Sequence, residues 1–137
     1  MLVDTNILIY AINEDSPKNK KAQEFLRENI GNLEIAHQNV LEAIRVLTHV
    51  KYSQPMKLED ALEAVQDASE ACEIISPDQS TYYLMLDFIK ENKLSGNRIF
   101  DGYLAATALS NGVEEIATDN IRDFKKFKGL KVINPFV

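Results

Sequence analysis

The sequence predicts an α/β fold, a three-layer α/β/α sandwich around a central, mostly parallel sheet of about five strands. Five short apolar segments of strand length alternate with longer segments in which apolar residues recur every three or four positions. Such alternation is typical of parallel sheets with helices on both faces. The length of 137 residues fits one domain, residues 1–137, that can bury its own core.

The five strand-like segments are short, and their ends carry polar residues or prolines. The first ends at Asp4, the third is closed by Pro77, and the last precedes Pro135. We expect all five to lie in one parallel sheet. They are residues 2–3, 33–36, 73–76, 115–118 and 131–133.

The segments between these strands have helical periodicity. Residues 7–12 fit either a strand or a helix, whereas Ser16-Pro17 predicts a helix start with Ser16 as N-cap, and Gly31 predicts its end. Further helices are expected over residues 38–50, 58–72, 79–93 and 98–111, with a short helix or turn over 119–127. Their apolar stripes predict core positions, which include Leu41, Val50, Leu58, Leu62, Val65, Tyr82, Met85, Phe88 and Phe100.

The composition predicts a globular protein in a reducing compartment. The single Cys72 excludes an internal disulfide and a cysteine-based zinc site. The first residues carry an acid and no basic region, so no signal peptide is expected, and no apolar run is long enough to span a membrane. We therefore expect a cytoplasmic protein.

The formal net charge of -6 argues, as a total, against a nucleic-acid partner. Its distribution changes that reading, because residues 58–91 hold nine acids and one base, and the other 103 residues sum to +2. A basic group follows Asp119 and is a candidate to contact the phosphates of a nucleic acid, although it also fits a solvated helix face. It comprises Arg122, Lys125, Lys126 and Lys128.

Four acids stand where a parallel sheet places its active site. Asp4 and Asp119 follow strands, and ligands bind beyond the carboxyl ends of such strands. Glu42 and Asp101 lie within apolar helical segments, where a carboxylate is costly unless it is paired or binds a metal. Clustered carboxylates with few histidines favour Mg²⁺ or Mn²⁺, and such ions are typical of phosphodiester hydrolysis.

Each acid also has a purely structural interpretation. Asp4 and Asp119 fit helix N-caps, and Asp101 in a first helical turn complements the helix dipole. Glu42 alone fits a solvated helix edge. The hypothesis of a metal site therefore rests on the set of four.

Four segments resemble, in order, the signatures of the PIN domain. They are Val3-Asp4-Thr5-Asn6, Gln38-Asn39-Val40-Leu41-Glu42-Ala43-Ile44-Arg45, Ile99-Phe100-Asp101-Gly102-Tyr103-Leu104-Ala105-Ala106, and Ala117-Thr118-Asp119-Asn120-Ile121-Arg122-Asp123-Phe124. The match covers essentially the whole chain, and the size is similar to that of the VapC toxins of VapBC toxin–antitoxin modules.

The resemblance implies a Mg²⁺- or Mn²⁺-dependent endoribonuclease, a VapB-type antitoxin as partner, and a homodimer. It assigns the acidic quartet to Asp4, Glu42, Asp101 and Asp119, with Asp4 and Asp101 as main metal ligands. Supporting roles fall to Thr5, Asn6 and Thr118. The family pattern is looser around the fourth acid. Both Asp119 and Asp123 are available here, which leaves open whether Asp123 shares or replaces the role of Asp119.

Three alternatives remain open at this point. The first is a PIN nuclease of RNA maturation with no toxin role. The second is a phospho-receiver domain, in which Asp78 after the third strand would accept phosphate. The third is a non-catalytic interaction module, against which the complete set of four acids argues. For the homodimer that the resemblance implies, the stripe around Leu58, Leu62 and Val65 is one contact surface to consider, although the same stripe fits the core.

Overall fold

A computed structural model describes all 137 residues and contains one five-stranded parallel sheet, as predicted. The strand order is β3-β2-β1-β4-β5, and every neighbouring pair is parallel. The strands are β1 (Leu2–Val3), β2 (Glu34–Ala36), β3 (Glu73–Ile75), β4 (Glu115–Ala117) and β5 (Lys131–Ile133). All five lie within or coincide with the predicted segments.

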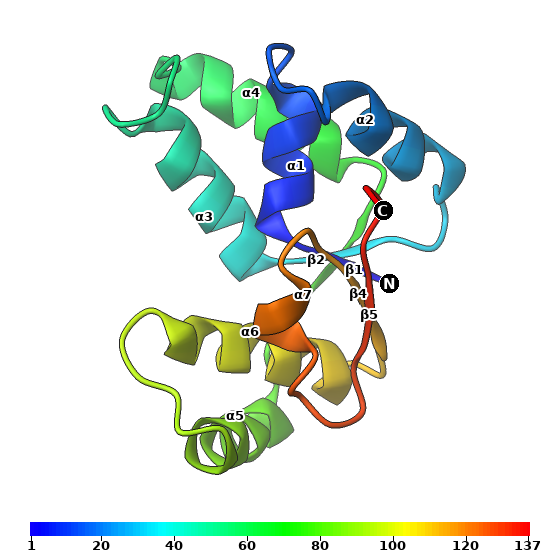
Figure 1. The fold of residues 1–137 in the computed structure, drawn as a ribbon, viewed down its shortest axis with the longest axis vertical. Coiled ribbons are helices and arrows are strands. Elements are labelled where there is room, and N and C mark those ends of the chain that lie inside the picture. The colour runs from blue at the N-terminus through cyan, green and yellow to red at the C-terminus, as the bar shows by residue number, and fades with distance from the viewer.

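Seven helices cover the sheet in two layers (Figure 1). Four helices lie on one side and three on the other, which gives the predicted α/β/α sandwich. The first group is α1 (Thr5–Ile12), α2 (Asn19–Glu28), α3 (His37–Thr48) and α4 (Leu58–Ser69). The second group is α5 (Gln79–Glu91), α6 (Arg98–Ser110) and α7 (Ile121–Phe124).

The hydrophobic core is divided by the sheet. One cluster packs α5, α6 and α7 against it, and two clusters lie among α1 to α4. The approach of α6 to α5 is close at Gly102, where an added Cβ would lie 3.0 Å from Leu94 Cδ1 and 3.6 Å from Ile89 Cγ1. A residue without a side chain therefore lets these two helices pack tightly, directly beside Asp101.

The predicted helix boundaries differ from the structure in the first quarter of the chain. Residues 7–12, which fitted either strand or helix, belong to α1. Helix α2 begins at Asn19 rather than at Pro17, because Ser16 forms a turn before the helix. In this turn the Ser16 Oγ accepts a hydrogen bond from the Lys18 N–H at 3.2 Å, and the Ser16 carbonyl accepts one from the Asn19 N–H at 3.0 Å. Ser16 is therefore a turn residue, and the N-cap is Lys18.

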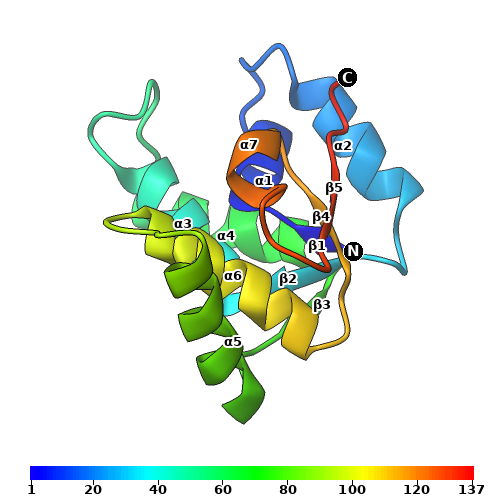
Figure 2. The ribbon, with the colours of Figure 1, turned by 60° about the horizontal axis from the view of Figure 1, so that its bottom comes forward.

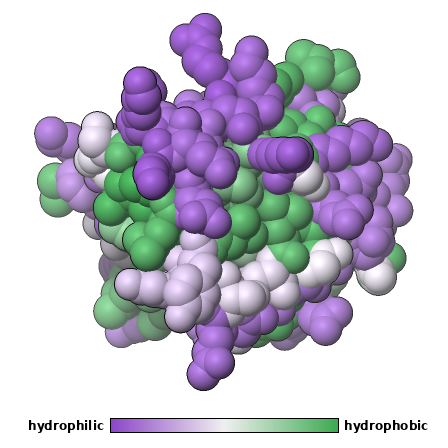
Figure 3. Space-filling view, turned by 90° about the horizontal axis from the view of Figure 1, so that it is seen from below, coloured by the Kyte–Doolittle hydropathy of each residue, from purple (hydrophilic) through white to green (hydrophobic).

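Several residues that the helical stripes predicted as core are exposed. Val65 and Phe88 are buried as predicted. Six other predicted core residues are each at least 39% exposed to solvent: Leu41, Val50, Leu58, Leu62, Tyr82 and Phe100. The face seen from the α5 side carries hydrophobic residues between hydrophilic ones (Figure 3). A stripe predicts which side of a helix is apolar, but it does not fix how far along that side the neighbouring elements extend.

The connections place a topological switch at the centre of the sheet. The helices after β1 and β2 lie on one side, the helices after β3 lie on the other, and β1 pairs with β4 in the middle. The crevice at the carboxyl ends of such strands is where open α/β sheets bind ligands. Asp4 follows β1 and Asp119 follows Thr118 after β4, so both residues lie at this edge of the sheet. None of the helices is long and apolar enough to cross a membrane.

Candidate active site

Asp4 is buried at the carboxyl end of β1 and begins α1. Its Oδ1 accepts from the Thr5 N–H at 2.8 Å, and its Oδ2 accepts from Thr118 Oγ1 at 2.7 Å and Asn6 Nδ2 at 3.3 Å. Burial, with smaller contributions from the charges of Glu42 and Asp123, raises the pKa of Asp4 to about 6, although the two shortest hydrogen bonds oppose this rise. The carboxylate is held in a fixed orientation, and no cation offsets its charge.

Glu42 reaches the same crevice from the middle of α3. Its Oε2 accepts from Thr5 Oγ1 at 3.0 Å, and its Oε1 accepts from Gln38 Nε2 at 3.0 Å. Asn39 is fully buried and donates to Thr5 Oγ1 at 3.3 Å, while its own oxygen accepts from the Ala36 N–H at 2.9 Å. A chain of hydrogen bonds from the end of β2 therefore orients both Thr5 and Glu42.

Asp101 lies in the first turn of α6 and is half-buried. Burial is the largest cause that raises its pKa to about 6, followed by the negative charges of Asp123 and Asp4, while the Lys126 ammonium acts in the opposite direction. Because Asp101 and Asp4 each respond to the other acids of the crevice, they share one electrostatic environment. The carboxylates come from three separate parts of the chain.

Asp123, which the sequence offered as an alternative fourth acid, belongs to this group. It lies on α7, which packs beside α6, and its charge acts on both Asp4 and Asp101. Its side chain is partly buried. The crevice therefore gathers Asp4, Glu42, Asp101 and Asp123.

Asp119 has different partners. Its Oδ2 accepts from Tyr10 Oη at 2.9 Å and pairs with the Lys18 ammonium, while its Oδ1 accepts from Asn134 Nδ2 at 3.4 Å. The bond from Lys18 is the largest cause that holds the pKa of Asp119 below its usual range. Asp119 contacts the site through its backbone, whose N–H donates to Asn6 Oδ1 at 3.3 Å. The structure thus brings Asp123, and not the Asp119 carboxylate, toward Asp4.

The donor chemistry of the crevice fits a hard divalent cation. Carboxylate oxygens are the ligands that Mg²⁺ and Mn²⁺ prefer. A cation would offset the burial of charge, and the smaller repulsion between acids, that raise the pKa of Asp4 and of Asp101. The acids do not form a finished cage, because no three acidic, histidine or cysteine side chains are grouped closely enough to hold an ion. Ions of this kind keep several water ligands and need few protein carboxylates.

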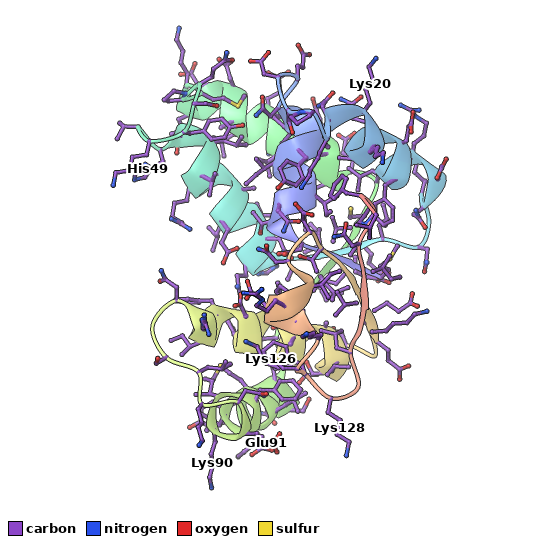
Figure 4. All side chains as sticks on the ribbon, in the orientation of Figure 1. Lys20, His49, Lys90, Glu91, Lys126 and Lys128 are labelled. Carbon is purple, nitrogen blue, oxygen red and sulfur yellow. The ribbon has the colours of Figure 1, made fainter.

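The basic residues predicted beyond Asp119 are not equivalent. Lys126 acts electrostatically on Asp101 and also lies 5.7 Å from the ring centroid of Phe127. Lys128 lies in the turn after α7 and projects away from the body of the molecule (Figure 4). Arg122 and Lys125 are exposed. Of the four, Lys126 is the one for which the structure records an interaction with the acidic crevice.

Other functional expectations from the sequence have structural outcomes. Asp78, the candidate phosphoacceptor, is the exposed N-cap of α5, where its side chain accepts from the Ser80 and Thr81 N–H groups at 2.8 and 3.1 Å. Its strand, β3, forms the sheet edge and does not adjoin β1. Sequence reasoning missed Gln38 and Asn39 as supports of Glu42. Their positions inside the second motif, four and three residues before Glu42, were the available signal.

Comparisons with known proteins identify the family of this chain. The PIN domain family profile matches residues 1–130. Ribonuclease VapC24 of Mycobacterium tuberculosis is 30% identical over 141 residues, which cover 97% of this chain and 94% of that protein. Ribonuclease VapC43 of the same species is 28% identical over 142 residues, which cover 98% and 95%.

Solved structures show the same fold. The toxin–antitoxin complex from Klebsiella pneumoniae contains a chain with a TM-score of 0.72 and 23% identity, with 98% of this chain and 97% of that chain covered. The DNA-bound VapBC from Salmonella typhimurium gives a TM-score of 0.74 at 19% identity, with 98% and 96% covered. The resemblance that the four sequence motifs suggested is confirmed, and the chain belongs to the PIN-domain family.

Proposed function

We propose that this chain, one PIN domain over residues 1–137, is a metal-dependent endoribonuclease of the VapC type. The observation that carries this proposal is the convergence of Asp4, Glu42, Asp101 and Asp123 on the carboxyl end of the central strands. The full-length similarity to VapC ribonucleases supports RNA as the substrate. A receiver function has no comparable support, because Asp78 is occupied as a helix cap.

In the proposed site, Asp4 and Asp101 would hold the ion, with Glu42 and Asp123 completing the negative surroundings. A Mg²⁺ or Mn²⁺ ion held there would supply an activated water and positive charge for the phosphate. The chain itself orients its ligands, because Thr118 and Asn6 donate to Asp4, and Thr5 donates to Glu42. Such outer hydrogen bonds fix the carboxylates and reduce the reorganisation that ion binding requires.

Lys126 is proposed as the cation that faces the substrate. Its charge acts on Asp101, so it lies within reach of a phosphate bound beside that carboxylate. Arg122, Lys125 and Lys128 remain candidates for weaker contacts farther along the RNA. Lys126→Ala is expected to weaken RNA binding and its dependence on salt concentration more than Lys128→Ala does.

The test is cleavage of RNA by the purified full chain with Mg²⁺, with Mn²⁺ and with a chelator. We expect cleavage that needs the ion and is lost in Asp4→Asn and Asp101→Asn. Asp78→Asn is the matched control, because Asp78 is an exposed aspartate outside the crevice. Equal cleavage by wild type and Asp4→Asn, or cleavage unaffected by the chelator, would contradict the proposal.

A toxin role with a VapB-type antitoxin completes the proposal, together with a cytoplasmic location and a homodimeric state. Structural neighbours that are toxin–antitoxin complexes support an antitoxin partner. Expression of the wild type is expected to arrest growth, and co-expression of the antitoxin to relieve the arrest. Normal growth together with cleavage of a precursor RNA would favour the alternative, a PIN nuclease of RNA maturation.

A further inference from the structure

A cavity of about 630 Å³ opens beside the acidic crevice, between α3 and α6. The two helices belong to opposite layers of the sandwich (Figures 1 and 2). Its lining includes Glu42 and Asp101, so it is continuous with the proposed metal site. The remaining lining comes mainly from the same two helices and includes Arg45, Asn97, Phe100 and Tyr103. This volume lies within the range of pockets that bind small molecules.

Three polar side chains that line the cavity away from the metal site have no partners within the chain. Neither the Arg45 guanidinium, the Asn97 amide nor the Tyr103 hydroxyl forms a hydrogen bond or ion pair. Asn97 precedes α6, but its side chain does not cap the helix. In the adjoining crevice, by contrast, Asp4 and Glu42 have specific partners. These free groups can therefore meet a ligand without breaking an internal bond.

Phe100 supplies a flat apolar surface in the cavity wall. Its side chain is 49% exposed and belongs to none of the hydrophobic clusters. It directly precedes Asp101, so its aromatic surface is one residue away from a proposed metal ligand. An exposed aromatic ring beside polar groups is the arrangement on which proteins stack unpaired nucleic-acid bases.

Gln38 links the cavity to the crevice. Its Nε2 donates to Glu42 Oε1 and to the Phe100 carbonyl, both at 3.0 Å. Because both partners are acceptors, the amide nitrogen must face them, and Oε1 is left as a buried oxygen with no hydrogen-bond partner. A buried acceptor without a partner is unfavourable, and a donor on a bound ligand would satisfy it.

We propose that this cavity binds one unpaired RNA base next to the scissile phosphate and makes cleavage depend on that nucleotide. The base stacks on Phe100, and Asn97 and Tyr103 contact its polar edge. Arg45 lies one helical turn beyond Glu42 on α3, where its charge suits the neighbouring phosphate. This inference rests on the proposed ribonuclease function and names residues that select its substrate.

The experiment is a double-mutant cycle between protein and RNA. The cleavage site is first mapped on an RNA oligonucleotide, and an abasic nucleotide is then placed in turn on each side of the scissile bond. Single-turnover cleavage is measured against protein concentration for the wild type, Phe100→Ala and Asn97→Ala. Tyr83→Ala is the matched control, because Tyr83 is an exposed aromatic residue, 68% accessible, on α5 and outside the cavity.

We expect Phe100→Ala to raise the half-saturating protein concentration about 10-fold or more, which is the scale of losing one base–aromatic stack. An abasic nucleotide on one side should weaken wild-type binding similarly but have little further effect on Phe100→Ala, because both changes remove the same contact. Asn97→Ala should reduce the preference among the four bases at that position. Tyr83→Ala should leave all these values unchanged.

Additive effects of the abasic site and Phe100→Ala, or no effect of either, would overturn the inference. Sedimentation of wild type and Phe100→Ala separates the other possible occupant, a second copy of this chain. Loss of a dimer in Phe100→Ala with unchanged base preference would also overturn it. If the wild type shows no metal-dependent cleavage at all, that separate outcome rejects the proposed function itself. In that case equilibrium binding of the same oligonucleotides to the wild type still tests the cavity.

Discussion

Asp4 and Asp119 lie beyond the carboxyl ends of two neighbouring strands, yet their surroundings are opposite. Asp4 is buried among acids, and its pKa is raised to about 6. Asp119 pairs with Lys18, accepts from Tyr10, and has its pKa held below the usual range. The Lys18 ammonium also lies 5.0 Å from the Tyr10 ring centroid and 5.2 Å from that of Phe136.

The difference shows that two aspartates at the same edge of a sheet can serve different purposes, one in the proposed site and one in stabilising the fold. The Asp119 cluster already contains its cation, Lys18. It joins α1 to the C-terminal segment, because Tyr10 of α1 and Asn134 both donate to the Asp119 carboxylate. The Asp4 cluster has hydrogen-bond donors that orient its carboxylates but lacks a charge that balances them. The oriented but unbalanced carboxylates of the Asp4 cluster are suited to bind a cation from solution. The Asp119 carboxylate, which is already paired with Lys18, stabilises the fold.

The largest expected difference between the two clusters is in activity. Asp4→Asn should reduce RNA cleavage by more than about 100-fold, because it removes a proposed metal ligand, and outer-shell changes alone cost roughly 10–100-fold. The loss of RNA cleavage in Asp119→Asn should stay below about 10-fold. The wild-type carboxylate faces Lys18, and the backbone hydrogen bond from residue 119 to Asn6 remains in the variant. Initial rates at saturating Mn²⁺ provide the measurement. Similar losses in both variants would show that Asp119 serves the metal after all.

The second difference is in the pH dependence of stability without metal. The folded-state pKa values of Asp4 and Asp101 are raised to about 6, so the folded protein binds protons more tightly than the unfolded chain. Their contribution is therefore fully present below about pH 4 and is lost as the pH rises through about 6. The free energy of unfolding should be higher at pH 5 than at pH 7, by an amount on the order of 2 kcal/mol.

Urea denaturation at several pH values measures this dependence. Asp4→Asn should show a shallower change between pH 5 and 7, since one of the two titrating groups is gone. Added Mg²⁺ should stabilise the wild type at pH 7 more than at pH 5, because protons compete with the ion. A wild type whose stability rises steadily from pH 5 to pH 7 would contradict the electrostatic description of the crevice.

The third prediction concerns the fourth acid. Asp123→Asn should weaken Mn²⁺ binding by about 10-fold, because Asp123 acts on both proposed main ligands. Isothermal titration of the ion measures the affinity directly and does not depend on an RNA substrate. Asp119→Asn is the matched comparison and should bind Mn²⁺ nearly as well as the wild type. The reverse ranking would assign the fourth position to Asp119.

The smallest expected effect is the loss of the Lys18 pair. Lys18→Met should lower the free energy of unfolding by roughly 0.5 kcal/mol, because the Lys18 side chain is 38% exposed and solvent screens the pair. Lys20→Met is the control, since Lys20 is exposed and forms no ion pair. Thermal denaturation of both variants is sufficient, and RNA cleavage by Lys18→Met should remain close to that of the wild type.

Much of the fold follows from short-range patterns. The five strands were predictable because brief apolar runs ended at polar residues or prolines, and their parallel pairing followed from the helices between them. Residues 7–12 could not be assigned, because a short apolar run has no distinct period. The start of α2 was missed because the Ser16 hydroxyl supports a turn rather than a helix cap.

For the candidate site, the sequence indicated which acids to consider but not which of them face each other. The motifs contained Asp4, Glu42, Asp101, Asp119 and Asp123. Asp119 and Asp123 lie only four residues apart. Their different surroundings depend on Lys18 and Tyr10, which bind the Asp119 carboxylate and lie about a hundred residues earlier in the chain. No local pattern contains that information.

By itself, the sequence determined the succession of strands and helices along the chain and the set of acids available for a metal. Apolar periodicity and motif spacing are local properties of the chain, so they can be read without the fold. The tertiary structure decided that Asp119 pairs with Lys18 while Asp123 joins the acidic crevice, and that Phe100 lines a cavity rather than the core. Burial and charge pairing depend on segments that meet only when the sheet assembles, so these choices exist only in the folded molecule.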